Sequence, residues 1–125
     1  MKERPVYLDL TQIKLPITAL CSIIHRISGI LMILSLPVLA ALMVLLFRHE
    51  AGFDHWQWLV SSMVMKAMYL GILWAWSYHM IAGLKHMVHD FSGYHSLKAV
   101  RMTSMLSLGV FALVAAFWVY VIGWY

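Results

Sequence analysis

Three long apolar runs constrain the fold of this chain more than any other feature. Residues 27–47, 67–84 and 102–125 contain no Asp, Glu, Lys or Arg. A helix needs about 20 mainly apolar residues to cross roughly 30 Å of hydrocarbon. Only 11% of the 125 residues are charged, against about a quarter in soluble domains. We therefore predict an all-α membrane protein with three transmembrane helices, at about residues 17–47, 59–89 and 101–123, in a single anchor domain over residues 1–125.

The basic residues predict an orientation in the membrane. Seven of the nine Lys and Arg residues lie before the first apolar run or between the second and third; Arg48 and Lys66 are the exceptions. The positive-inside rule then places the N-terminus in the cytoplasm and the C-terminus outside. The basic residues are spread along the membrane edges, so we expect no nucleic-acid binding. The first residues lack an apolar core with a cleavage site, so we expect no cleaved signal peptide. The single cysteine, Cys21, permits no internal disulfide.

A histidine lies well inside the second apolar run. Ionisable side chains are costly within a membrane, and they normally face a partner, a cavity or a cofactor. Gly71, Ala75 and Gly83 share the helical face of His79, and such small residues would let a flat ring or another helix approach closely. Two interpretations remain open from the residues alone. His79 is either an axial ligand of haem iron or a histidine hydrogen-bonded to a neighbouring helix.

The other histidines near this run do not supply a second axial ligand by sequence spacing. His86 lies seven residues beyond His79, about 10.5 Å along a helix. Two nitrogens on one metal ion lie roughly 4 Å apart, by analogy with metal–imidazole bonds of about 2 Å. We expect His25 to lie too near the cytoplasmic edge to meet His79 face to face. If His79 binds haem, the second ligand therefore comes from another subunit.

A polar cluster marks the start of the first helix. Ser22, His25 and Arg26 are three and four residues apart, so they share one helical face. They are predicted at the same membrane edge as His86. A guanidinium suits a haem propionate, and a serine hydroxyl suits a quinone carbonyl. The simpler alternative is a snorkelling arginine beside a capping serine.

These residues resemble a known family. The segments RPV (residues 4–6) and SIIHRIS (residues 22–28) are similar to the cytochrome b subunit of succinate dehydrogenase, or complex II. The segment HMIAGLKHM (residues 79–87), followed by Asp90, is similar to the second signature of that family. The resemblance covers the whole chain. One departure is Lys85, where the family usually has Arg; lysine keeps the charge but lacks the bidentate fork.

The resemblance implies a particular role in the membrane. The chain would be an anchor subunit of succinate:quinone oxidoreductase in a bacterial inner (cytoplasmic) membrane, without acting on succinate itself. His79 would be one axial ligand of a single haem b, and a second small anchor subunit would supply the other axial histidine. Ser22 and Arg26 would help to form a ubiquinone pocket, and His25, Arg26 and His86 would lie near the haem propionates.

The resemblance also implies the other partners. A flavoprotein subunit would oxidise succinate, and an iron–sulfur subunit would pass the electrons to quinone at the membrane edge. One alternative is the anchor of a fumarate reductase, which uses a quinone of lower potential. An alternative of another class is a membrane scaffold or transport protein without haem, in which His79 belongs to a proton path.

Overall fold

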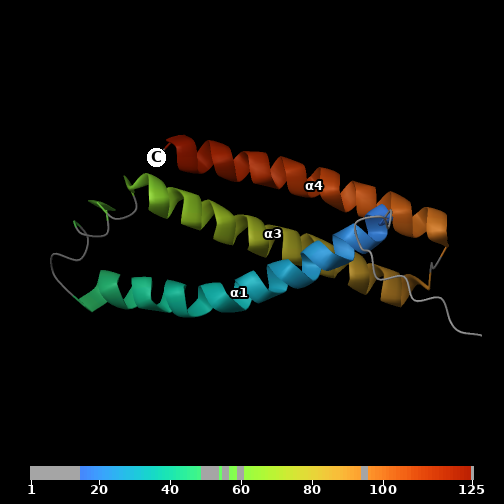
Figure 1. Cartoon of the computed structure of the whole chain (residues 1–125), viewed down its shortest axis with the longest axis horizontal. Helices are drawn as coiled ribbons and strands as arrows, with labels where there is room; N and C mark the ends of the chain where they lie inside the picture. Colours follow the sequence, from blue (N-terminus) through green and yellow to red (C-terminus); the bar gives the residue numbers. More distant parts are fainter. Residues whose placement is uncertain (1–14, 49–53, 55–56, 59–60, 94–95, 125) are drawn as a thin grey trace, which may run out of the picture.

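The computed structural model describes residues 15–48, 54, 57–58, 61–93 and 96–124. Three long helices are the main elements of these residues: α1 (Ile17–Arg48), α3 (Met63–Ser92) and α4 (Leu97–Trp124). They lie side by side, and the start of α1, the end of α3 and the start of α4 share one end of the bundle (Figure 1). The all-α prediction with three long helices is therefore confirmed.

Serine caps set the starts of two helices. Ser62 precedes α3, and its hydroxyl accepts a hydrogen bond from the Met65 amide at 3.3 Å. The Ser96 hydroxyl accepts from the Ala99 amide at 3.2 Å at the start of α4. Gly93 ends α3 in the left-handed region, with φ of 66°. These caps, rather than the charged residues that flank the apolar runs, explain why α3 lies later in the chain than predicted and why α4 starts earlier.

Two helices have the length and apolar composition of membrane spans. Among the described residues they are α1, over Ile17–Phe47, and α4, over Leu97–Trp124. The third helix, α3, has 30 residues and is about 45 Å long, which exceeds a hydrocarbon core. It also carries Lys66, His79 and Lys85, so its mean hydropathy is lower. That α3 crosses the membrane with the other two remains a prediction.

The helix interfaces are built from small and polar side chains, while large apolar side chains face outwards. This arrangement is typical of membrane helices, because lipid is as apolar as the residues that it surrounds, and close packing rather than water exclusion brings the helices together. The buried residues are Cys21, Ser28, Ser35 and Leu42 of α1, Ala75, Tyr78 and Ala82 of α3, and Ser104 and Ser107 of α4.

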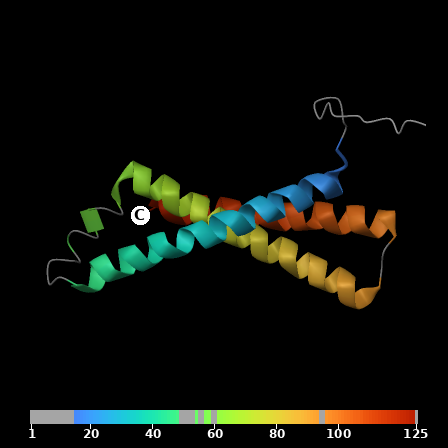
Figure 2. The ribbon, with the colours of Figure 1, turned by 60° about the horizontal axis from the view of Figure 1, so that its bottom comes forward.

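The middle element in space is α3, which packs against both neighbours, whereas α1 and α4 touch each other less. A second view shows α1 and α3 crossing in an X (Figure 2). Four aromatic side chains of α3 and α4 donate hydrogen bonds to the neighbouring helix and so fix the register. They run from Tyr78 Oη to the Cys21 carbonyl (3.0 Å), from Trp76 Nε1 to Ser35 Oγ (3.0 Å), from Trp118 Nε1 to Ser77 Oγ (3.0 Å) and from Trp74 Nε1 to the Ala115 carbonyl (3.3 Å).

Candidate functional site

His79 is half-buried between α3 and α1, with one edge of its ring against Gly29. A Cβ atom placed on Gly29 would lie 2.9 Å from His79 Cε1 and 3.3 Å from Nδ1. The first distance is shorter than real Cβ contacts, so any larger residue at position 29 would push the imidazole away. Gly29 therefore belongs to the site. Sequence reasoning missed it, because the glycine is distant in sequence and its role depends on how α1 crosses α3.

One ring nitrogen of His79 is held by α1. Its Nδ1 lies 3.2 Å from the carbonyl oxygen of His25 and 3.3 Å from Ser28 Oγ. The Ser28 hydroxyl donates its own hydrogen to that carbonyl, at 2.7 Å. Both neighbours of Nδ1 are thus acceptors, and this network assigns the ring proton to Nδ1. Nε2 then carries the lone pair, which is the state in which imidazole binds a metal.

Both interpretations of His79 are compatible with this geometry. The ring is hydrogen-bonded to a neighbouring helix, as the simpler interpretation requires. That contact uses Nδ1, whereas Nε2 makes no hydrogen bond to any residue that the structure describes. Histidines that bind metal usually donate their other N–H to a carbonyl or carboxylate, which fixes the ring and raises its basicity. The observed contacts are therefore also those of a metal ligand.

The structure corrects the expected place of His25. Its ring stacks on that of His79, with centroids 4.3 Å apart and planes inclined by 25°. It also lies 5.3 Å from the ring of His86. The prediction that His25 is too shallow to meet His79 was wrong. Since α1 begins at Ile17, His25 lies about 12 Å inside the helix, and the crossing places its ring between two α3 histidines that are two turns apart.

The stacked arrangement also bears on metal binding. Imidazole lone pairs lie in the ring plane, so two rings that face each other do not point their nitrogens at one ion between them. Within this geometry, His79 and His25 are not two axial ligands of one iron.

One buried polar atom of this cluster has no hydrogen-bond partner among the described residues. His25 Nε2 is buried and makes no hydrogen bond to any residue in the described part of the chain. It lies 3.7 Å from the position of a Cβ on Gly83. Buried polar atoms are nearly always satisfied, so an orphan of this kind calls for a polar group that the described residues do not supply. A haem propionate is such a group, and an imidazole N–H can donate to it.

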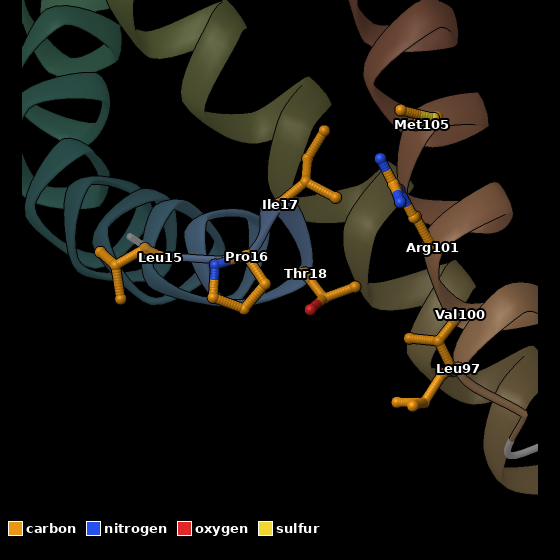
Figure 3. Close-up of a pocket in the computed structure, with 8 residues that line it drawn as sticks. All are labelled: Leu15, Pro16, Ile17, Thr18, Leu97, Val100, Arg101 and Met105. Atoms are coloured by element: carbon orange, nitrogen blue, oxygen red, sulfur yellow. The ribbon is translucent and has the colours of Figure 1, made fainter. Parts of the chain in front are cut away.

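Ser22 and Arg26 stand on a more open part of α1. Ser22 is half-buried and Arg26 is exposed. A cavity of about 530 Å³ lies nearby, between the first turns of α1 and α4, and Figure 3 shows the Arg101 side chain reaching into it. Neither Ser22 nor Arg26 lines this cavity, whose walls are Leu15, Pro16, Ile17, Thr18, Leu97, Val100, Arg101 and Met105.

Lys85, which departs from the family motif, has a hydrogen-bond partner on α4. Lys85 Nζ donates to Ser104 Oγ at 3.4 Å, and Ser104 is fully buried in the α3–α4 interface. One turn further, His89 Nε2 lies 2.7 Å from Thr103 Oγ1. Lys85 and His89 therefore both contact side chains of α4. The residues of the first motif that lie before Leu15, including Arg4 and Pro5, are outside the described residues.

The fold and the site together define a class: an all-α membrane protein with a histidine cluster between two antiparallel helices. Residues 1–121 match the family described as "Succinate dehydrogenase/Fumarate reductase transmembrane subunit". The chain belongs to this family.

Several bacterial relatives carry the same name, "Succinate dehydrogenase cytochrome b556 subunit". The relative from Coxiella burnetii is 31% identical over 104 residues, which cover 82% of each chain. That from Paracoccus denitrificans is 30% identical over 92 residues, covering 74% of this chain and 70% of its own. That from Rickettsia felis is 28% identical over 101 residues, covering 81% and 78%. The expected family, a membrane subunit of succinate dehydrogenase, is thus confirmed.

Proposed function

We propose that this chain is the membrane anchor of a succinate dehydrogenase that binds haem b and ubiquinone and carries electrons from the iron–sulfur subunit to quinone. The observation that carries the proposal is at His79: the His25 carbonyl holds Nδ1, while Nε2 makes no hydrogen bond to any of the described residues. The relatives named cytochrome b556 support a haem of the b type.

The residues present fit a haem. His79 Nε2 would hold the haem iron, and a bound haem would supply one-electron redox chemistry. His25 Nε2 is buried without a hydrogen-bond partner among the described residues, so it suits a propionate together with His86 and Arg26. The stacked His25 ring would not hold the same iron as His79. The proposal therefore assigns the other histidine on the iron to a second small anchor subunit.

In this proposal, Ser22 and Arg26 bind the quinone. Their positions four residues apart place the hydroxyl and the guanidinium on one face of α1, at the end of the bundle where α3 ends and α4 starts. The hydroxyl donates a hydrogen bond to a quinone carbonyl. The guanidinium stabilises the negative charge that develops on the quinone oxygens as electrons arrive. The iron–sulfur subunit covers this end and completes the pocket, and succinate oxidation belongs to the flavoprotein subunit.

The proposal also covers the membrane in which the chain lies and the type of complex to which it belongs. All three helices cross a bacterial inner membrane, with the histidine cluster nearer the cytoplasmic side. We place the protein with succinate dehydrogenases rather than fumarate reductases because the relatives at 30% and 31% identity carry the former name. The family itself includes both directions.

The first test replaces the proposed ligand. Membranes that contain the complex should show a b-type reduced-minus-oxidised spectrum, and His79→Ala should abolish it. His89→Ala is the matched control, since His89 lies on the same helix but faces Thr103 of α4; it should retain the spectrum. A complex without haem in the unmodified protein, or full haem content in His79→Ala, would contradict the proposal.

The second test concerns the shared coordination. This chain supplies one axial ligand, so the chain purified alone should not form low-spin, six-coordinate haem. Adding the second anchor subunit should produce that spectrum. A six-coordinate spectrum from the monomeric chain alone would show that both ligands come from it.

A further inference from the structure

We propose that Ser28 and Gly29 are positioning residues for His79: together they select the Nδ1–H tautomer of the ring and hold Nε2 in one direction. The inference rests on the proposed haem role of His79. It goes beyond that role, because it assigns the control of the ligand to α1, in a segment that supplies no ligand itself.

The first step of the argument is the hydrogen bonding at Nδ1. Ser28 is 4% exposed, so its hydroxyl is not replaced by water. Its hydrogen goes to the His25 carbonyl at 2.7 Å, which leaves Oγ as an acceptor 3.3 Å from His79 Nδ1. The carbonyl, 3.2 Å from the same nitrogen, is the second acceptor. Two acceptors on one side hold the ring proton there and direct the lone pair to the other side.

The second step is the contact between Gly29 and the ring edge. A Cβ at position 29 would come within 2.9 Å of His79 Cε1. The ring would then have to rotate or move outwards, and Nδ1 would leave the pair of acceptors. Glycine at this position is thus required by the close approach of the imidazole, and not by an unusual backbone conformation, since among the described residues only Gly93 has a positive φ.

A second buried serine of α1 provides a control for a purely structural role of Ser28. Ser35, two turns later, is also buried, at 5% exposure. Its hydroxyl donates to the Met32 carbonyl at 2.7 Å and accepts from Trp76 Nε1 of α3 at 3.0 Å. Ser35 therefore makes the same kind of backbone bond and the same kind of contact with an α3 ring as Ser28, but it does not touch His79.

The experiment compares Ser28→Ala, Ser28→Thr and Ser35→Ala in the assembled complex. The readouts are haem retained during titration with a competing apo-haem protein, the midpoint potential of the haem, and its low-spin electron paramagnetic resonance signal. Loss of a partner of a metal-bound histidine typically weakens metal binding by about 10–100-fold. Ser28→Ala should therefore bind haem about tenfold more weakly. Its midpoint potential should rise, because a less basic imidazole donates less charge to the iron.

The two other variants serve as controls with defined outcomes. Ser28→Thr keeps the hydroxyl and should restore the potential and the resonance signal of the unmodified complex. Ser35→Ala should lower stability without changing either haem property. Equal haem properties in Ser28→Ala and Ser35→Ala would overturn the inference while leaving the role of His79 intact. If the unmodified complex lacks a b-type spectrum, the proposed function itself is wrong, and this inference with it.

If the Ser28→Ala complex does not assemble, two glycine variants test the same inference. Gly29→Ala should shift or abolish the low-spin signal. Gly109→Ala is the control, because a Cβ on this α4 glycine meets no atom within 4 Å. Identical haem signals in the two variants would show that the ring does not depend on its contact with α1, which contradicts the inference.

Discussion

At the scale of single residues, the chemistry of His79 depends on neighbours that are distant in sequence. An imidazole in an apolar helix can be a hydrogen-bonding group or a metal ligand, and the residue type does not distinguish them. The atoms of α1 fix only part of the answer: the His25 carbonyl holds Nδ1, and Nε2 makes no hydrogen bond to any residue that the structure describes, which is compatible with both roles. His25 itself has a buried Nε2 without a described partner, which makes it a second polar group available to a cofactor.

The quinone prediction belongs to this scale. Ser22→Ala and Arg26→Leu should lower quinone reduction by about tenfold or more, because a hydrogen bond to a charged group contributes about 1.5–3 kcal/mol. Succinate oxidation with a soluble artificial acceptor should be retained, since it does not pass through this chain. Lys98→Leu is the control, an exposed basic residue in the first turn of α4 that does not line the cavity between α1 and α4. Equal loss of both activities would indicate failed assembly and leave the quinone site unsupported.

At the scale of helices, α3 joins the bundle through polar contacts rather than through large apolar side chains. It lies between α1 and α4, and its buried residues are Ala75, Tyr78 and Ala82. Tryptophan N–H groups cross both interfaces, from α3 to Ser35 of α1 and from α4 to Ser77 of α3. Without its serine, each indole N–H group would have no hydrogen-bond partner in hydrocarbon. These bonds therefore help to hold α3, the least apolar of the three helices, between α1 and α4.

This arrangement predicts a measurable coupling between α3 and α4. Ser77→Ala removes the acceptor of Trp118 Nε1 and should destabilise the assembled complex by about 0.6 kcal/mol, the typical strength of such bonds in membrane helices, and by no more than about 1.7 kcal/mol. Thermal unfolding in detergent measures the change. Ser92→Ala should have no effect, because among the described residues the exposed Ser92 hydroxyl bonds only to the His89 carbonyl of its own helix. A double variant with Trp118→Phe that loses the full sum of both single effects would argue against the coupling.

At the scale of the whole molecule, the proposed haem site needs a second subunit. The chain brings three histidine rings into one column, but in the proposal only His79 would hold the iron. Large apolar side chains cover the outer faces of all three helices, where lipid and the second anchor subunit would contact them. The start of α1, which carries Ser22 and Arg26, lies at the same end of the bundle as the end of α3 and the start of α4 (Figure 1).

The orientation of the molecule can be tested with introduced cysteines. The native Cys21 is 1% exposed, so its background reaction with a membrane-impermeant thiol reagent should be low. Ser96→Cys marks the connection between α3 and α4, and Gly123→Cys marks the end of α4, where a new side chain meets no atom within 4 Å. In right-side-out vesicles we expect Gly123→Cys alone to react. In inverted vesicles we expect Ser96→Cys alone to react. Reaction of Ser96→Cys in right-side-out vesicles would show that the orientation is the opposite of the predicted one.

Much of the fold could be predicted because the bilayer acts as a selective solvent. Uncharged runs of about 20 residues have few stable alternatives to a membrane helix, so the helical class, the three helices and their order follow from hydropathy. The motifs around His25 and His79 likewise predicted the family. Helix ends were less accurate, since the serine caps Ser62 and Ser96 are short local signals that the apolar pattern does not contain.

The contacts of the site could be decided only by the tertiary structure. Whether His25 reaches His79, which nitrogen of His79 carries the proton and why position 29 must be glycine all depend on the angle and register at which α1 crosses α3. Those quantities come from the close packing of small side chains and from hydrogen bonds between residues 41 to 57 positions apart. Hydropathy describes the preference of each single residue for lipid or water. It therefore contains no information about which residues meet across two helices.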